Sequence, residues 1–279
     1  MKHFAIYTNF HKDKEMAVTK KVQAFLHQKE VETTVLVKKP EEEAFFKLEK
    51  ADCMIVLGGD GTMLQASRDM KGLDIPMIGV NLGTLGYMTQ IETGNLEEAL
   101  ERLVNGDFQI ESRMMLNARI VRNGIVREEN WALNDVVIAR SGSIKIIKYN
   151  IYVNGQFLNN YSADGVIVTT PTGSTGYNLS AGGPIVEPKA RLIMLTPICP
   201  HTLNQRSIIL SAEDVVEIEI PEGRDGQKQM VEASFDGDGG VCMCTGDRIR
   251  IVKSDKVLKM IQLNQVSFLE VLHRKMRDN

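Results

Sequence analysis

The chain has 279 residues and a formal net charge of −3 at pH 7; 43% of its residues are hydrophobic and 25% are charged. This composition is typical of a globular protein with one large core or two smaller cores. Lysine and arginine are scattered, which argues against nucleic acid as a partner. The apolar runs are too short to cross a membrane and no signal-peptide pattern is visible, so we expect a cytoplasmic protein without a membrane partner.

The four cysteines fit a reducing compartment. Cys53 lies in an apolar strand-like run, and Cys242 and Cys244 fall on one face of a predicted strand. No pair has C-x-x-C spacing, and no disulfide framework is implied. Buried, reduced thiols are the commoner state. A zinc site made by Cys199, His201 and the Cys242–Cys244 pair is the alternative.

The first third of the chain alternates between strand-like and helix-like segments. β-Branched or apolar runs predict strands, and apolar residues at helical spacing predict helices. The predicted strands are residues 3–9, 31–39, 53–58 and 75–83, and the predicted helices are residues 15–29, 41–51, 61–70 and 95–106. Such alternation predicts a Rossmann-like parallel sheet with helices on both faces.

After about Gly106 the pattern changes to short strands with turn signals, including asparagine–glycine pairs at 123–124 and 154–155. This predicts an all-β, sandwich-like C-terminal domain over residues 108–264. The α/β domain then covers residues 1–107 and is joined by a C-terminal helix over residues 265–279. We expect that helix to pack on the α/β domain, because Phe268, Leu269 and Leu272 need a place to be buried.

The segment VLGGDGT, residues 56–62, follows a predicted strand and precedes a helix. Gly58, Gly59 and Gly61 permit positive φ angles and let a phosphate approach the backbone, and a helix starting near Thr62 offers unpaired N–H groups. These features are those of a phosphate-binding turn. The segment is not a Walker loop, because no lysine follows, and it is not a G-x-G-x-x-G fingerprint. The alternative is a plain turn in which Asp60 caps the helix.

Asp60 favours the functional interpretation, because a carboxylate repels phosphates unless something compensates. Phosphoryl transfer needs one residue that orients the nucleophile, with Mg²⁺ or another divalent metal and backbone donors around the phosphates. Asp60 is therefore expected to face the acceptor's hydroxyl. The residues expected to bind the donor's phosphates are Gly58, Gly59, Gly61 and Thr62, and the sequence identifies no metal ligands.

Three further segments carry polar residues among glycines or strands. The glycine segment GVNLGTLGYM, residues 79–88, follows a strand, where parallel sheets bind ligands, and packing is the default role for Tyr87. Asn134 and Asp135 interrupt an apolar run, which indicates either a turn or bulge or a ligand-binding pair. SFDGDGG, residues 234–240, lacks the remaining ligands of a calcium loop, so a hairpin turn or a carboxylate at the edge of a ligand site is expected.

ADGVIVTTPTGSTGYNLSAGGPIV, residues 163–186, is the most informative stretch. Asp164 opens it with a turn, and small polar side chains follow on a glycine-rich loop. They suit hydrogen bonds to a sugar and a base, with Tyr177 as a stacking face: Thr172, Ser174, Thr175, Tyr177, Asn178 and Ser180. A serine-hydrolase elbow is excluded, because G-x-S-x-G would need glycine at position 172.

GGDGT, NLGTLGY, ESRMML, ALNDVVIAR, TPTGSTGY with its flanks, CPHTLNQRSIIL and SFDGDG together resemble, in order, the sequence blocks of the NAD kinase family, whose bacterial members use ATP or polyphosphate. GGDGT alone is shared with diacylglycerol and sphingosine kinases, whereas TPTGSTGY with ND upstream is more specific. The resemblance covers most of the chain. It implies an enzyme that uses ATP, or polyphosphate, and a divalent metal to phosphorylate the 2′-hydroxyl of the adenosine ribose of NAD, which makes NADP.

The resemblance also implies roles for single residues. Asp60 would be the base, with Gly61 beside it, and Asn134 and Asp135 would bind NAD. The adenosine half would be framed by the loop residues Thr175, Gly176, Tyr177 and Ser180, and Thr172 and Asn178 of the same loop would also bind NAD. Asp164 would reach the nicotinamide half, and further NAD contacts are implied for Lys145, Ser162 and Asp236. The family forms homo-oligomers, which implies a homodimer or homotetramer.

Two positions depart from the family pattern, which more often has glutamate where Asp135 stands and alanine where Gly176 stands. The first change shortens the side chain's reach, and the second loosens the loop. Two other classes of protein fit the sequence less well than an NAD kinase. A lipid kinase is disfavoured because no amphipathic membrane-binding stretch is visible. A silent nucleotide sensor is disfavoured because a pure binder gains nothing from a carboxylate beside phosphates.

Overall fold

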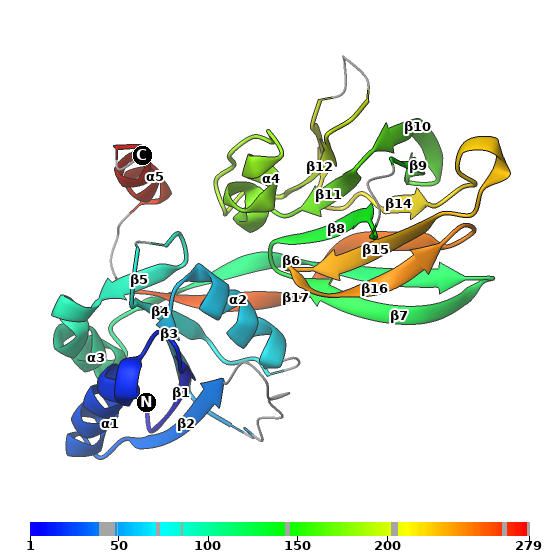
Figure 1. Ribbon diagram of the computed structural model, residues 1–279. Helices are drawn as coiled ribbons and strands as arrows, with labels where there is room; N and C mark the ends of the chain where they lie inside the picture. Colours follow the sequence, from blue (N-terminus) through cyan, green and yellow to red (C-terminus); the bar gives the residue numbers. More distant parts are fainter. Residues whose placement is uncertain are drawn as a thin grey trace. The chain divides into compact units, whose positions relative to one another are not determined.

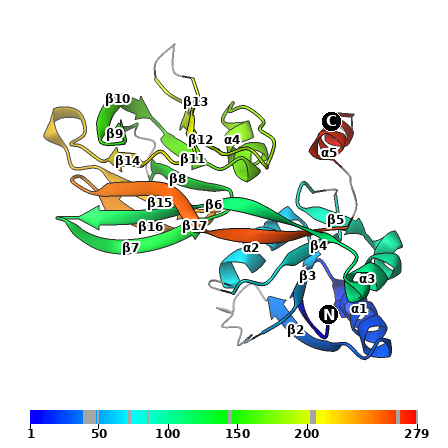
Figure 2. The same ribbon diagram turned by 180° about the vertical axis from the view of Figure 1, so that it is seen from behind.

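The computed structural model describes residues 1–38, 48, 50–70, 73–84, 86–142, 146–201, 206–263 and 267–277. The chain divides into two compact units: unit 1 contains Met1–Ser112 and Leu258–Asn279, and unit 2 contains Arg113–Val257. The sequence-based boundaries lie at 107/108 and 264/265. In the structure, the units meet within β6 (Gln109–Arg122) and within β17 (Arg248–Gln262), and both strands run unbroken from one unit into the other (Figure 2). The sequence therefore has no loop that would mark either boundary.

Unit 1 has the predicted α/β architecture. Its parallel strands lie in the order β2, β1, β3 and β4, and both β5 and the end of β17 pair in parallel with β4. The helix predicted over residues 41–51 falls mainly outside the described residues. The elements are β1 (His3–Asn9), η1 (Lys14–Met16), α1 (Ala17–Gln28), β2 (Glu32–Lys38), β3 (Cys53–Gly58), α2 (Asp60–Asp69), β4 (Met77–Asn81), β5 (Thr89–Glu92), η2 (Thr93–Asn95), α3 (Leu96–Asn105) and α5 (Phe268–Arg277).

Alternation along the central strands decides which helix covers which face of this sheet. Ile6 of β1 shares a buried cluster with Leu26 of α1 and Leu100 of α3. Tyr7 points to the opposite face, where its hydroxyl donates to the Asp69 carboxylate of α2 at 2.6 Å. Helices therefore cover both faces, as predicted, with α1 and α3 on one and α2 on the other (Figure 1). No helix among the described residues is long and apolar enough to span a membrane.

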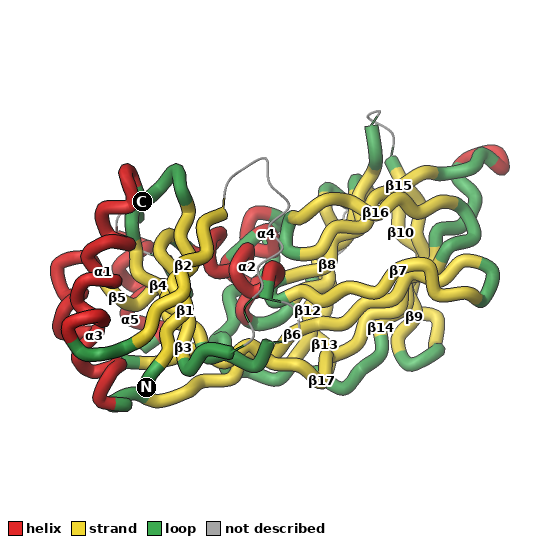
Figure 3. Tube along the Cα trace, turned by 90° about the horizontal axis from the view of Figure 1, so that it is seen from below, coloured by secondary structure: helices red, strands yellow, loops and turns green. Residues whose placement is uncertain are grey.

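Unit 2 is built almost entirely from strands (Figure 3). One antiparallel sheet has the order β13, β12, β11, β8, β15, β16; the strands of the other are β10, β9, β14 and the first part of β17, with the β6–β7 hairpin. Both sheets bury side chains in one common cluster, which confirms the sandwich-like prediction. The remaining elements are β7 (Ile125–Ala132), β8 (Asp135–Arg140), β9 (Ile147–Val153), β10 (Gln156–Ala163), β11 (Gly165–Thr169), η3 (Thr172–Thr175), α4 (Tyr177–Ser180), β12 (Leu192–Ile198), β13 (Ile208–Ser211), β14 (Val216–Glu219), η4 (Arg224–Gly226), β15 (Met230–Phe235) and β16 (Asp238–Cys244).

The hairpin turns of unit 2 follow their sequence signals. Asn123 and Gly124 between β6 and β7 have φ angles of 52° and 76°, and residues 154 and 155 between β9 and β10 repeat this conformation. Two consecutive left-handed residues define a type I′ turn, which suits the twist of a hairpin. Asp236 and Gly237 do the same between β15 and β16, with φ angles of 52° and 72°. The hairpin interpretation of SFDGDGG is therefore confirmed.

The C-terminal helix α5 contacts unit 1 less fully than expected. Its Phe268 ring lies 6.0 Å from the Tyr87 ring, centre to centre, and its Lys275 ammonium lies 4.9 Å from the same ring. Tyr87 thus has the packing role expected of it. None of the described helix residues is buried, and Leu269 is 70% exposed. The expected burial of Leu269 is wrong, because Phe268 and Lys275 make the contact and leave Leu269 in solvent.

Candidate functional site

The GGDGT segment forms the turn between β3 and α2. The Gly59 carbonyl accepts the N–H groups of Thr62 at 2.8 Å and Met63 at 3.1 Å, and the Thr62 hydroxyl accepts the Gly59 N–H at 3.4 Å. Gly59 is therefore the N-cap residue and α2 begins at Asp60. The helix thus begins two residues before the expected Thr62, and the alternative in which Asp60 caps it is wrong, because Gly59 occupies the cap position.

Steric space, and not a positive φ angle, explains the glycines of this turn. None of the three glycines has a positive φ. A methyl group on Gly58 would lie 2.2 Å from Thr62 Oγ1, and one on Gly59 would lie 3.2 Å from Lys12 Nζ, whereas one on Gly61 would meet nothing within 4 Å. Gly58 thus lets Thr62 close the turn, and Gly61 leaves the outer side of the first turn of α2 open.

The Asp60 carboxylate is held by the second glycine segment. Its Oδ2 accepts the Tyr87 N–H at 2.7 Å, and its Oδ1 accepts the Met88 N–H at 2.9 Å. A methyl group on Gly86 would lie only 2.0 Å from Asp60 Oδ1, so glycine is required there. A carboxylate offers about four lone-pair directions, so Asp60 can still accept further hydrogens. The structure therefore brings the two glycine segments together around one oriented carboxylate.

Thr89 is a site residue that the sequence did not indicate. Its side chain is 5% exposed, and its hydroxyl has no hydrogen-bond partner among the described residues. A methyl group on Gly86 would lie 2.0 Å from Asp60 Oδ1 and 2.8 Å from Thr89 Oγ1. The Thr89 hydroxyl and the Asp60 carboxylate therefore border the same small space beside Gly86. Buried hydroxyls normally have partners, so this one is suited to a ligand. A threonine that opens a strand gives no signal of this in the sequence.

In unit 2, Asp236 organises the connection between β7 and β8. Its Oδ2 accepts the Leu133 N–H at 2.8 Å, and its Oδ1 accepts those of Asn134 at 2.7 Å and Asp135 at 3.1 Å. Consecutive N–H groups of this kind form an anion-binding nest, and here the protein's own carboxylate occupies it. Asp236 thus fixes the backbone of the Asn134–Asp135 pair. A direct contact between Asp236 and a substrate stays a prediction.

The TPTGSTGY loop packs against the same connection. The Asn134 carbonyl accepts a hydrogen bond from the Thr169 hydroxyl at 2.9 Å. A methyl group on Gly173 would lie 2.4 Å from the Asn134 carbonyl oxygen, and one on Gly176 would lie 3.4 Å from Asn134 Nδ2. Asn134 Oδ1 and Thr172 Oγ1 are buried and have no partner among the described residues. These two oxygen atoms are therefore candidates for hydrogen bonds from a ligand.

Within this loop, Asn178 is a structural brace. It is fully buried; its amide donates to the carbonyls of Ser174 at 3.2 Å and Pro184 at 3.0 Å, and its oxygen accepts the Thr196 hydroxyl at 2.6 Å. The side-chain amide therefore already has hydrogen-bond partners within the protein. Its predicted contact with NAD stays a prediction. The predicted side chains that remain accessible on this loop are Thr175, Tyr177 and Ser180.

Two predicted residues, Asp164 and Ser162, have other partners than this cluster. Asp164 forms an ion pair with Arg140 at 3.3 Å, a partner that the sequence did not indicate. Ser162 lies on β10, where its carbonyl accepts the His201 N–H at 2.9 Å. Within the described residues, no hydrogen bond or ion pair joins Ser162 or Asp164 to the Asn134–Asp135 pair. Lys145 lies outside the described residues.

Asp135 has unusual electrostatics. Its side chain is 5% exposed, and burial, followed by repulsion from the Asp236 carboxylate, raises its pKa to about 7. Its carboxyl group is therefore poised to change charge near neutral pH. A perturbed acid beside unpartnered polar atoms is typical of a binding or catalytic site.

No metal-binding cluster is found in the described part of the chain: nowhere do three or more His, Cys, Asp or Glu side chains gather. The zinc alternative at Cys199, His201 and the Cys242–Cys244 pair is thus unsupported. The expectation of buried thiols holds for Cys53, whereas Cys199 and Cys242 are exposed.

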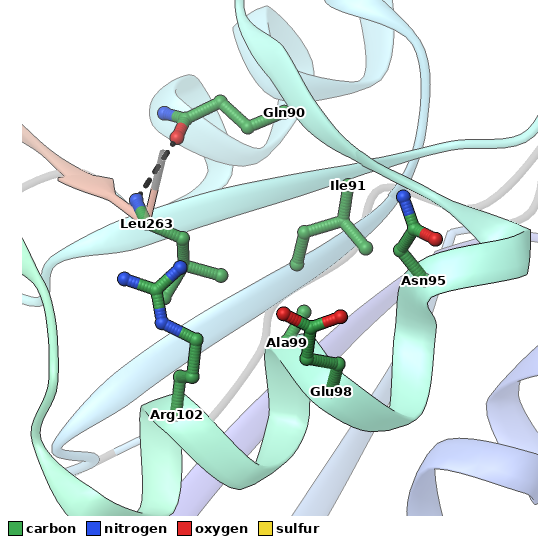
Figure 4. Close-up of a pocket in the computed structure, with 7 residues that line it drawn as sticks. All are labelled: Gln90, Ile91, Asn95, Glu98, Ala99, Arg102 and Leu263. Carbon is green, nitrogen blue, oxygen red and sulfur yellow. Dashed lines mark hydrogen bonds between the residues drawn. The ribbon is translucent and has the colours of Figure 1, made fainter. Parts of the chain in front are cut away.

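A small pocket lies on the α3 side of unit 1 (Figure 4). Its lining residues are Gln90, Ile91, Asn95, Glu98, Ala99, Arg102 and Leu263. The Gln90 side chain donates to the Ile261 carbonyl at 2.6 Å and accepts the Leu263 N–H at 3.3 Å, which fixes the end of β17. None of the predicted site residues lines this pocket, so it does not belong to the candidate site.

The fold and the site define a class: a two-unit kinase, with a carboxylate at a glycine-rich strand-to-helix turn in one unit and a polar, glycine-rich loop in the other. Residues 4–108 match the ATP-NAD kinase N-terminal domain, and residues 133–263 match the ATP-NAD kinase C-terminal domain. The chain belongs to the ATP-NAD kinase family.

Full-length relatives agree with this assignment. The NAD kinase of Lachnospira eligens is 46% identical over 295 residues, covering 99% of this chain and 100% of that protein. The NAD kinase of Lachnoclostridium phytofermentans is 44% identical over 284 residues, and the match covers both chains completely.

Solved structures share the fold. An Archaeoglobus fulgidus NAD kinase in complex with ATP has a TM-score of 0.79 and 26% identity, with complete coverage of both chains. Yeast NADH kinase complexed with NADH has a TM-score of 0.89 at 23% identity, over 100% of this chain and 88% of that one, and supports the fold alone.

The two glycines of the GGDGT turn should respond differently to alanine. Gly61→Ala should keep or raise the Tm, because alanine favours a helix over glycine by about 1 kcal/mol, yet it should lower kcat/KM about tenfold or more if phosphate approaches that open side. Gly58→Ala, the matched variant, should lower the Tm because the methyl group overlaps Thr62. Thermal melts and kinase assays check both, and full activity in Gly61→Ala would contradict the phosphate assignment.

Asp135 should make stability depend on pH. Since its folded pKa of about 7 lies above its unfolded value of 3.8, the folded state binds more protons between these limits, and the wild-type protein loses stability as pH rises through them. Asp135→Asn cannot ionise. Its Tm relative to wild type should therefore increase between about pH 5 and about pH 8. A Tm difference that stays constant over this range would show that Asp135 does not titrate there.

Proposed function

We propose that this chain transfers the terminal phosphoryl group of ATP to the 2′-hydroxyl of the adenosine ribose of NAD, which gives NADP and ADP. Family membership over both domains supports the reaction, and the ATP complex of the archaeal relative supports the donor. The structural observation that carries the proposal is the Asp60 carboxylate. It sits at the first residue of α2, where phosphate would bind, in an orientation fixed by two backbone N–H groups.

In the proposed step, the 2′-oxygen forms a bond to the terminal phosphorus, and the bond from that phosphorus to the bridging oxygen breaks, so ADP leaves with the electron pair. Asp60 orients the hydroxyl and takes its proton late, because an alcohol is a far weaker acid than a carboxylic acid. The first N–H groups of α2, including that of Gly61, and the helix dipole stabilise the phosphates. The charge of Asp60 thus serves the acceptor, while the open glycine backbone serves the donor.

The polar residues of unit 2 are proposed to bind NAD. Asn134 Oδ1, Thr172 Oγ1 and Asp135 offer acceptors to ribose and base, and ribose hydroxyls that donate to Asp135 would favour its ionised form. Tyr177, 47% exposed, offers a stacking face. The further contacts in the proposal are those of Lys145, Ser162, Asp164, Thr175, Gly176, Asn178, Ser180 and Asp236.

A divalent metal, with Mg²⁺ as the first choice, belongs to the proposal as a companion of ATP. Mg²⁺ is usually held by one or two carboxylates together with substrate phosphates, so it needs no dedicated protein cage. The donor set fits this: no three-ligand cluster exists among the described residues, but the free lone pairs of Asp60 and the Thr89 hydroxyl are at hand. When bound, the metal neutralises charge on the phosphates.

We further propose that the protein works in the cytoplasm as a homodimer or homotetramer and that inorganic polyphosphate is a second donor. These points rest on the family resemblance. The described cysteines are free, which suits a reducing compartment.

Purified protein should form NADP from ATP and NAD in the presence of Mg²⁺, as read by an NADP-specific dehydrogenase. Asp60→Asn should lower kcat about 100-fold or more, because an amide cannot accept the proton. It should also cost about 1–3 kcal/mol of stability, since its NH₂ group would face the N–H of Tyr87 or Met88. Tm and NAD affinity measured on the same variant separate the two effects.

Asp52→Asn is the matched control, because the Asp52 carboxylate also accepts two backbone N–H groups, from Lys2 at 2.6 Å and His3 at 3.1 Å, outside the site. It should keep the wild-type kcat. Phosphorylation of a lipid acceptor in place of NAD would refute the proposed function, and a folded Asp60→Asn protein with wild-type kcat would refute the role of Asp60.

A further inference from the structure

Lys12 places a positive charge at the GGDGT turn. Parallel pairing of β1 with β3, in which Thr8 lies opposite Leu57, brings the chain that leaves β1 beside the chain that leaves β3. Lys12 Nζ is so close to the turn that a methyl group on Gly59 would lie 3.2 Å from it. A lysine that is far away in the sequence thus reaches the backbone of the phosphate turn.

The position of the Lys12 ammonium beside the N-terminus of α2 is electrostatically unfavourable when no anion is bound there. Gly59 is the N-cap of α2, and the N-terminus of a helix carries partial positive charge that repels a cation. Among the described residues, no carboxylate forms an ion pair with Lys12. The Lys12 ammonium and the helix N-terminus therefore both favour an anion at the turn.

The backbone that carries Lys12 is fixed on both sides. The Asn9 carbonyl accepts the N–H groups of Lys12 and Asp13, each at 3.0 Å, and the Asn9 side chain accepts the His11 N–H at 3.1 Å. Asp13 is 2% exposed, and its carboxylate accepts the Thr19 N–H at 2.8 Å at the start of α1. The lysine is thus presented from a well-braced loop.

The Thr89 hydroxyl gives independent support for a ligand beside this turn. It is buried, lacks a partner among the described residues, and borders the same space as the Asp60 carboxylate. The Asp60 side of the turn thus also presents an unpartnered polar group to a ligand that binds there.

We propose that Lys12 binds the terminal phosphates of the nucleotide donor at the GGDGT turn and neutralises charge on the phosphoryl group during transfer. The inference rests on the proposed function and adds a residue to it. In P-loop enzymes a lysine within the loop does this work. Here the lysine comes from the loop after β1, so GGDGT needs no lysine of its own.

The test compares Lys12→Met with Lys14→Met, a matched control that removes the same charge two residues further on, together with Lys12→Arg. Lys12→Met should raise the KM for ATP or lower kcat by about 10- to 100-fold, as expected for loss of a charged hydrogen bond, while the KM for NAD stays within about twofold. Lys12→Arg should recover part of the loss, and Lys14→Met should resemble wild type.

A second readout needs no turnover: the rise in Tm that ATP causes in the wild-type protein should shrink in Lys12→Met and persist in Lys14→Met. If wild type makes no NADP, the proposed function fails, and this shift still tests Lys12. The inference is overturned by ATP kinetics and ATP-induced Tm shifts in Lys12→Met that equal those of wild type. It is also overturned by equal losses in Lys14→Met, or by a rise in the KM for NAD as large as that for ATP.

Discussion

The contact of the Asp60 carboxylate with the N–H groups of Tyr87 and Met88 is the interaction on which the site in unit 1 depends. It joins the turn after β3 to the connection between β4 and β5, which alternation and pairing alone would leave independent. Both carboxylate oxygens are engaged, so the group cannot rotate without losing a bond. A carboxylate held in this way presents its remaining lone pairs in fixed directions, which is what the proposed orientation of a hydroxyl nucleophile requires.

Unit 2 uses the same device with a different result. Asp236, at the tip of a hairpin, accepts three successive N–H groups and so fixes the connection that carries Asn134 and Asp135. Burial raises the pKa of Asp135, and the negative charge of the neighbouring Asp236 raises it further. In one unit the backbone-bound carboxylate is the proposed reacting group, and in the other it is a brace that tunes its neighbour. Both leave few degrees of freedom for the ligand to order on binding.

The elements of the fold were largely predictable, and the contacts of the site were not. Strand–helix alternation indicated the parallel sheet, and the asparagine–glycine pairs indicated their hairpins, because these signals are local. The bracing role of Asp236 depends on partners about a hundred residues away in the sequence, and that of Asn178 depends on how its own loop closes onto β12, so polarity alone suggested ligand contacts for both. Thr89 and Lys12 gave no signal at all. Their relevance comes from the register of parallel strands, which places the ends of neighbouring strands side by side.

In the proposed reaction, the unit 1 site must serve two ligands with opposite electrostatic needs. A phosphate donor favours positive charge, whereas a hydroxyl acceptor needs a negative group to take its proton, and one turn must serve both. The turn separates the two by chain geometry: Asp60 is pulled toward the backbone of Tyr87 and Met88, and the helix N-terminus with Lys12 stays on the glycine side. A lysine within the turn would lie close to Asp60 and form an ion pair that weakens the base. A cation supplied from the loop after β1, as proposed for Lys12, would keep the carboxylate available for the acceptor.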